Sequence, residues 1–114
     1  MNEDCIFCKI IARTIPAKLV HQDDHVVVIE DIHPQAPTHL LVISRAHIAR
    51  VLDLGDEHAT LVARIFEAAN RVARERRLED GFRVVVNNGP GAGQTVDHLH
   101  FHVLGGRPMR WPPG

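Results

Sequence analysis

The stretch 98–106, HLHFHVLGG, places histidines at alternate positions, each followed by an apolar residue. Successive side chains of a β-strand point to opposite faces, so this alternation predicts a strand whose two faces differ in chemistry. His98, His100 and His102 would lie in a row on one face, and the apolar residues between them would lie on the other. The stretch therefore predicts a sheet with one histidine-lined face and one face that packs against a helix.

The rest of the chain supplies the other elements of such a sheet. Runs rich in β-branched and apolar residues predict further strands at 19–22, 25–31, 38–45 and 83–88, the first three as an antiparallel meander. Apolar residues at three- and four-residue steps predict one long amphipathic helix over 56–78, with Gly81 as its cap. Residues 5–12 are expected to form a short helix. The expected fold is α+β, with a five-stranded antiparallel sheet and a long helix on one face.

Length and charge narrow the functional classes. A chain of 114 residues is expected to form a single domain, 1–114. Thirteen Lys and Arg against fourteen Asp and Glu give a formal net charge of -1 without a basic stripe, so neither nucleic acid nor membrane is an expected partner. The first residues are acidic and Lys9 interrupts their short apolar run, so no signal peptide or membrane span is predicted. We expect a cytoplasmic protein.

A glycine-rich loop, GPGAGQT at 89–95, precedes the histidine strand. Its glycines free the backbone to turn N–H groups toward an anion, and nearby side chains add donors. The residues concerned are Gly89, Gly91, Gly93, Asn87, Gln94 and Thr95. The loop is not a P-loop, because the Gly-Lys-Ser/Thr sequence is absent and a strand follows. Paired histidines on a strand can also ligate zinc. The loop and the histidine row together favour a phosphate site.

Cys5 and Cys8 form a Cys-x-x-Cys motif near the amino terminus. Two cysteines so close together do not make a disulfide framework, and a reducing compartment would keep them as thiols or metal ligands. Buried free cysteines also serve as ordinary small apolar side chains. The motif alone leaves both possibilities open.

The histidine strand resembles the His-x-His-x-His-x-x signature of the histidine triad superfamily. Other segments are similar to its nucleotide-binding (HINT) branch, namely IFCKII, IPAK, DIHPQAPTHLLVI, the HI pair at 47–48, VVNNG, GQTV and HVLGGRPMRWPPG. The resemblance covers nearly the whole chain. It implies a homodimer in which two five-stranded sheets join. It also implies hydrolysis of adenosine 5′-phosphoramidates or acyl-adenylates, with purine nucleotides of the AMP or GMP type as ligands.

The resemblance also implies roles for individual residues. His100 would be the nucleophile that is transiently nucleotidylated, and His102 would contact the phosphate and assist proton transfer. Asn87, Gly93 and Thr95 would hold phosphate oxygens, and Asp31 would bind the ribose hydroxyls. The base pocket would be walled by Ile6, Phe7, Ile10, Ile29 and Ile32. Trp111, in the terminal tail, would approach the active site of the partner subunit.

By the same resemblance, Cys5 and Cys8 would hold a structural zinc together with His47 and His98, tying the amino-terminal turn to the sheet. His47 has two competing roles, because it would support the catalytic histidines in relatives that lack the cysteines. No metal would be required for catalysis. The other histidines have no assigned role; they are His21, His25, His33, His39 and His58.

Two further functions stay open at this point. One is a purine-nucleotide-binding regulatory protein in which hydrolysis is incidental, and many turnovers per site on an adenosine phosphoramidate would argue against it. The other is a zinc-dependent hydrolase that uses the histidine row as ligands. Activity that persists after complete metal removal would exclude this second function.

Overall fold

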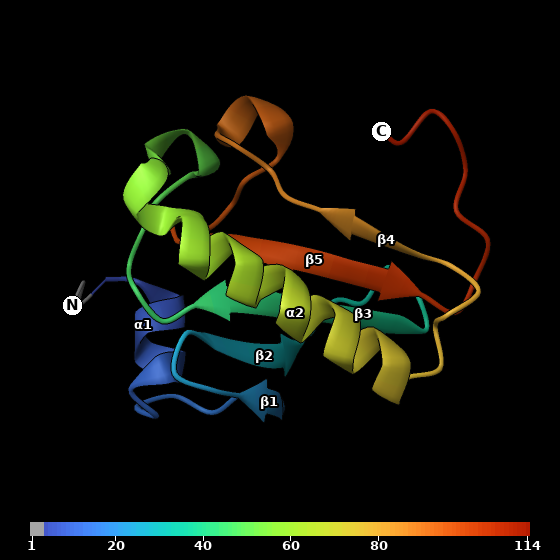
Figure 1. Ribbon diagram of the computed structural model, residues 1–114, viewed down its shortest axis with the longest axis horizontal. Coiled ribbons are helices and arrows are strands. Elements are labelled where there is room, and N and C mark those ends of the chain that lie inside the picture. Colours follow the sequence, from blue (N-terminus) through green and yellow to red (C-terminus); the bar gives the residue numbers. More distant parts are fainter. Residues whose placement is uncertain (1–3) are drawn as a thin grey trace.

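The computed structural model describes residues 4–114. Its elements are α1 (Ile6–Ile11), β1 (Leu19–Gln22), β2 (Val26–Glu30), β3 (Thr38–Ser44), α2 (Ala59–Glu75), β4 (Phe82–Val85) and β5 (His100–Gly105). The strands form one antiparallel sheet in the order β1-β2-β3-β5-β4. Figure 1 shows α2 crossing one face of this sheet, with α1 at one end. The predicted fold class, including the meander of the first three strands, is confirmed.

The period-2 alternation of the strands builds a separate core on each face of the sheet. Alternate residues of β2, β3 and β5 pack under α2; they are Val26, Val28, Leu40, Val42, Phe101 and Val103. The residues between them face the other way, where Val27, Ile29, Leu41 and Ile43 pack against Phe7 and Cys8 of α1. His100 and His102 share this second face, because their neighbours Phe101 and Val103 are committed to the helix side. The expected division of the strand into a histidine face and an apolar face is confirmed.

Several boundaries differ from the sequence expectation. β4, expected over 83–88, runs over Phe82–Val85. β5 begins at His100, and His98 lies in a bend just before it. α2 begins at Ala59, after a 3-10 turn over Asp56–His58 that was predicted as its first residues. No helix within residues 4–114 has the length and apolar character needed to cross a membrane.

The carboxyl end of α2 corrects the expectation that Gly81 caps it. Arg77 takes the left-handed conformation with φ of 59°. Its N–H donates to the carbonyl of Arg74 at 3.0 Å, and the N–H of Leu78 donates to that of Ala73 at 2.9 Å. These two bonds make a Schellman motif. The chain turns at Arg77 because the next side chain, Leu78, is buried, and Gly81 lies beyond the motif.

Arg77→Gly is expected to stabilise the protein. The left-handed conformation is about 1 kcal/mol less favourable for an arginine than for a glycine. We therefore expect a net gain of about 0.5 to 1 kcal/mol in the free energy of unfolding. Urea denaturation measures this gain. The matched control, Arg74→Gly within α2, should lose about 1 kcal/mol. A loss of stability in Arg77→Gly would contradict the assignment.

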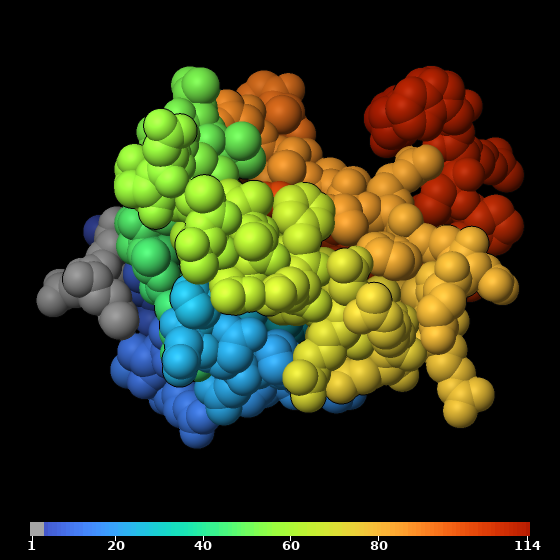
Figure 2. Space-filling model, viewed as in Figure 1, coloured from blue at the N-terminus to red at the C-terminus, as the bar shows by residue number. Residues whose placement is uncertain are grey.

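The carboxyl-terminal residues project from the body of the protein. Figure 2 shows them as a red lobe at the upper right of the molecule. Trp111 is 81% exposed, and the guanidinium of Arg83 on β4 donates to the carbonyl of Arg110 at 2.9 Å. The approach of this tail to a partner subunit stays a prediction.

Candidate functional site

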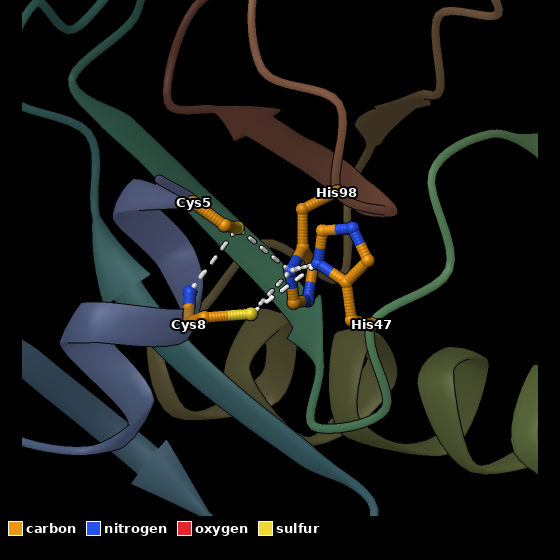
Figure 3. Close-up of side chains that lie close together, drawn as sticks. All are labelled: Cys5, Cys8, His47 and His98. Atoms are coloured by element: carbon orange, nitrogen blue, oxygen red, sulfur yellow. Dashed lines mark hydrogen bonds between the residues drawn. The ribbon is translucent and has the colours of Figure 1, made fainter. Parts of the chain in front are cut away.

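Four potential metal ligands meet where α1 abuts the sheet (Figure 3). Cys5 is the N-cap of α1 and accepts the N–H of Cys8 on its sulfur, so the Cys-x-x-Cys spacing brings both sulfurs to the amino end of the helix. The Nδ1 of His98 lies 3.2 Å from the sulfur of Cys5 and 3.6 Å from that of Cys8. The Nδ1 of His47 lies 3.3 Å from the sulfur of Cys8 and 3.1 Å from the Nδ1 of His98.

The geometry of this cluster fits a tetrahedral zinc ion. Tetrahedral ligands at Zn–S of about 2.3 Å and Zn–N of about 2.0 to 2.1 Å stand roughly 3.3 to 3.6 Å from one another, close to the observed separations. The Nε2–H of His98 donates to the carbonyl of Ser44 at 2.6 Å, so its Nδ1 carries a lone pair toward the centre of the cluster. Burial raises the pKa of the Cys5 thiol, and a bound cation would counter this by favouring the thiolate. The predicted ligand set is thus brought together.

A second arrangement fixes the tautomer of His100. Its Nδ1 lies 2.6 Å from the carbonyl oxygen of His98, which only accepts, so Nδ1 carries the hydrogen. The lone pair of the neutral ring is therefore on Nε2. Burial lowers the pKa of His100 and keeps the ring neutral. A buried neutral imidazole with one free lone pair is equipped to act as a nucleophile.

A chain of hydrogen bonds leads from the backbone to His102. The N–H of Gln35 donates to Nδ1 of His39 at 3.0 Å, so the ring hydrogen of His39 is on Nε2. That Nε2 lies 2.9 Å from Nδ1 of His102, which must accept, leaving the hydrogen of His102 on its own Nε2. Burial and the neighbouring His100 and His39 lower the pKa of His102 to about 4. His102 is thus a neutral N–H donor, with its ring centroid 5.2 Å from that of His100.

The structure adds His39 to the site, although the sequence analysis gave this residue no role. His39 is buried on β3, and its Nε2 also lies 3.4 Å from Oδ2 of Asp31. Asp31, His39 and His102 are close enough to share a metal ion. However, the hydrogen bond from Gln35 places a hydrogen on the nitrogen of His39 that would have to bind it. The trio is therefore arranged for hydrogen bonding and not for coordination.

The buried side chain of Gln94 holds the glycine-rich loop together through hydrogen bonds to the backbone. Its Oε1 accepts the N–H of Gly89 at 2.7 Å, and its Nε2 donates to the carbonyls of Ala49 and Val96 at 2.8 and 2.9 Å. Gly89 and Gly93 both take positive φ values, as the expected turn requires, and Gly91 does not. The side chain of Gln94 thus serves the loop backbone. Its contact with phosphate stays a prediction, as do those of Asn87, Gly93 and Thr95.

The expected base-pocket residues lie around α1 and β2. Phe7 and Ile29 are buried, whereas Ile6 is 47% and Ile32 86% exposed. Ile10 and Ile29 line a cavity of about 500 Å³ between α1 and the first two strands. Asp31 accepts the N–H of His33 at 2.7 Å. Their binding of a nucleoside stays a prediction.

Acid is expected to destabilise the fold over a defined pH window. Burial lowers the pKa of His102 to about 4 and lowers those of His39 and His100. The unfolded chain binds these protons near pH 6.5, so unfolding takes up protons and stability rises with pH. We expect full stability above about pH 6.5, and a loss of up to about 2 to 3 kcal/mol from His102 as the pH falls toward 4.

Urea denaturation at several pH values measures this loss. His102→Asn should flatten the dependence relative to the parent, because asparagine does not titrate. His33→Asn, at an exposed histidine, should leave it unchanged. Acid also releases any bound metal, which lowers the stability of both variants equally. The difference between the two variants therefore reports His102 alone. An equally steep dependence in His102→Asn would contradict the prediction.

Alternating histidines on an interior strand, beside a Cys2His2 cluster at one end of the sheet, define a class of α+β proteins with a histidine-lined site. The family model of the HIT domain matches residues 12–109, and the chain belongs to this family. It is 47% identical over 114 residues to an uncharacterized HIT-like protein of Synechococcus elongatus, covering all of both chains. It is 43% identical over 111 residues to a 14 kDa zinc-binding protein of Zea mays, covering 96% of this chain and 87% of the relative.

Solved structures agree with this assignment. A HIT family hydrolase from Legionella pneumophila superposes with a TM-score of 0.95 at 47% identity, covering 97% of this chain and all of the other. At this similarity the fold of the two proteins is the same, and the predicted membership of the histidine triad superfamily is confirmed.

Proposed function

We propose that this protein is a hydrolase of purine nucleoside phosphoramidates and acyl-adenylates, in the manner of the nucleotide-binding branch of its family. The observation that carries the proposal is the hydrogen bond from Nδ1 of His100 to the carbonyl of His98, which leaves Nε2 as a free nucleophile. The similar Legionella pneumophila protein is described as a HIT family hydrolase. That description supports the reaction class, and the histidine geometry supports the covalent route.

In the first step on a phosphoramidate, Nε2 of His100 forms a bond to the α-phosphorus while the bond to the leaving nitrogen breaks. An alkylamine leaves only with a proton, because its conjugate acid has a pKa of about 10.4. We assign this proton to His102. The anionic substrate favours a protonated His102 at neutral pH, although the pKa is low in the free protein. The departing amine takes the proton, and His102 becomes neutral.

In the second step, water attacks the phosphorus of the nucleotidyl-His100 intermediate and gives its proton to His102. The P–N bond to His100 breaks, AMP or a related monophosphate leaves, and His100 returns to its neutral form. When Nδ1 of His102 carries a proton, the Nε2–H of His39 turns to Oδ2 of Asp31, 3.4 Å away. His39 is thus a positioning residue that adapts to both protonation states of His102.

The other predicted residues complete this proposal. Asn87, Gly93 and Thr95 bind phosphate oxygens, Asp31 binds the ribose, and the isoleucines with Phe7 enclose the purine. We propose a homodimer, with Trp111 near the site of the partner. Zinc binds to Cys5, Cys8, His47 and His98, which fill all four positions of a closed structural centre, as the zinc-binding relative from Zea mays suggests. The bound ion supplies a cross-link, and no reaction step passes through it.

His39→Phe is expected to lower kcat by about 100-fold with little change in KM. The substitution removes the hydrogen bond that sets the tautomer of His102, and proton transfer is worth about 10² to 10⁴ in rate. The pH profile of kcat should shift as well, which a purely structural defect would not cause. His21→Phe, at a histidine that pairs with Asp23 on the outer strand, is the matched control and should keep normal kcat. Equal kcat values for the two variants would contradict the role of His39.

A fluorogenic adenosine phosphoramidate tests the proposed function directly. Many turnovers per site support an enzyme, and a single slow turnover favours a nucleotide-binding regulatory protein. Brief incubation followed by mass spectrometry should show one nucleoside monophosphate on the peptide that contains His100. Loss of all hydrolysis in chelator-treated protein that remains folded and still binds AMP would favour the zinc-dependent hydrolase instead.

A further inference from the structure

The metal cluster and the nucleophile are joined through one residue, His98. We propose that the centre formed by Cys5, Cys8, His47 and His98 positions His100, so that metal occupancy sets the orientation and tautomer of the nucleophilic ring. This inference rests on the proposed function, because it assigns a purpose to the geometry of its nucleophile. It gives the centre a role beyond cross-linking α1 to the sheet.

The first connection runs through the peptide group between His98 and Leu99. The carbonyl of this group accepts Nδ1–H of His100 at 2.6 Å, and its N–H donates to the carbonyl of Ile48 at 2.6 Å. Ile48 directly follows the ligand His47. The orientation of this peptide therefore depends on both histidine ligands. His98 supplies its carbonyl, and the segment that contains His47 accepts its N–H. The acceptor for His100 is fixed when both ligands are fixed.

The second connection runs through Phe7, which lies between the two cysteines on α1. Its buried ring makes edge-to-face contacts with His98 at 5.9 Å and with His100 at 4.9 Å between centroids. A helix of six residues is too short to be stable by itself. A metal held by Cys5 and Cys8 anchors α1, and thereby keeps Phe7 against the His100 ring.

Without a cation, only hydrogen-bond donors hold this arrangement together, namely the two thiols and the ring of His47. The hydrogen bond to Ser44 leaves a lone pair on Nδ1 of His98, which lies 3.1 Å from Nδ1 of His47. Without metal, His47 or the thiols must supply protons to this nitrogen or move away. A thiol or imidazole hydrogen bond holds the ring of His98 less firmly than coordination by a metal. Without metal the peptide after His98 is therefore freer to move, and His100 can then turn its ring or carry its hydrogen on Nε2. That second tautomer has no lone pair on Nε2, the nitrogen that attacks the phosphorus.

Histidine ring nitrogens report this positioning without any substrate. We would label the full chain with 15N-histidine and record long-range proton–nitrogen spectra at alkaline pH, where the rings are neutral. Zinc-loaded protein should show His100 as a single Nδ1–H tautomer. Protein stripped of metal should show broadened signals and a several-fold larger Nε2–H fraction, restored by adding zinc. A folded metal-free protein with an unchanged His100 tautomer would overturn the proposal.

If chelation unfolds the protein, the variant Phe7→Leu tests the positioning of His100 in zinc-loaded protein instead. The variant should keep its full zinc content yet show mixed His100 tautomers, and the rate of nucleotide transfer to His100 should fall about 10-fold. Ile11→Ala is the matched control, because Ile11 is on the same helix and in the same core but is neither a ligand nor a ring neighbour of His100. An unchanged His100 spectrum in zinc-loaded Phe7→Leu overturns the proposal. Absence of hydrolysis with the expected spectra would count against the proposed function alone.

Discussion

His100→Ala is expected to abolish turnover, lowering kcat by at least about 10⁴-fold. Among residues 4–114, His100 is the one ring of this site whose Nε2 lone pair is fixed by a backbone acceptor of Nδ1–H, and the variant loses it. His102 presents an N–H instead, because His39 donates to its Nδ1. AMP should still bind within a few-fold of the parent affinity, since the substitution removes one ring and leaves the glycine-rich loop and the proposed purine pocket in place.

Steady-state hydrolysis and calorimetric AMP binding together check this result. His102→Asn is the informative comparison, because it should slow nucleotide transfer and still form an adduct on His100. His33→Ala, at an exposed histidine, should have normal kinetics. Hydrolysis by pure His100→Ala at a rate near that of the parent would remove His100 from the role of nucleophile.

Metal removal is expected to lower the thermal midpoint by about 10 to 20 °C. Stripping the centre leaves two buried thiols and a buried imidazole without their common partner, and the binding energy of a structural metal contributes to folding. A loss of about 3 to 5 kcal/mol corresponds to such a shift in a chain of this size. Readdition of zinc should restore the midpoint, and magnesium should not, because thiolates and imidazoles are poor ligands for it.

A double variant, Cys5→Ala with Cys8→Ala, is the matched control for the chelator. It should melt at a lower temperature from the start, and chelation should change it no further. Elemental analysis gives the zinc content of each sample. An unchanged midpoint in parent protein whose zinc content has fallen to zero would rule out a structural role for the metal.

Local patterns were enough to predict the sheet and its two faces. The alternation in β5 assigned His100 and His102 to one side, and the spacing of apolar residues located α2. Such patterns depend only on neighbours in the chain. The predicted ends of the elements were therefore wrong where contacts between residues far apart in the sequence determine the conformation. His98 leaves the strand because its ring is bound to Ser44 and lies in the metal cluster. Arg77 takes the left-handed position expected of a glycine because burial of Leu78 sets the turn.

The candidate site was less accessible to sequence reasoning. The metal ligands come from three separate segments, so spacing alone could not join His47 to the cysteines, and only the family resemblance did. His39 was missed because its role depends on the register of β3 and β5, in which Leu41 lies opposite His102. A signal was present: in the segment THLLVIS, His39 falls on the same face as Leu41 and Ile43. An antiparallel pairing with the histidine strand would have placed it beside the triad.

Gln94 has a consequence for how tightly the loop can bind an anion. Its side-chain amide is hydrogen-bonded to the backbone at positions 49, 89 and 96. The conformation of the loop is therefore fixed before any ligand binds. A phosphoryl group that binds to such a rigid loop loses its own translational and rotational entropy. No further conformational entropy is lost in ordering the loop. If the loop binds the phosphate as proposed, discrimination between substrates then depends on the purine and on the leaving group, the two parts of the substrate that the loop does not contact.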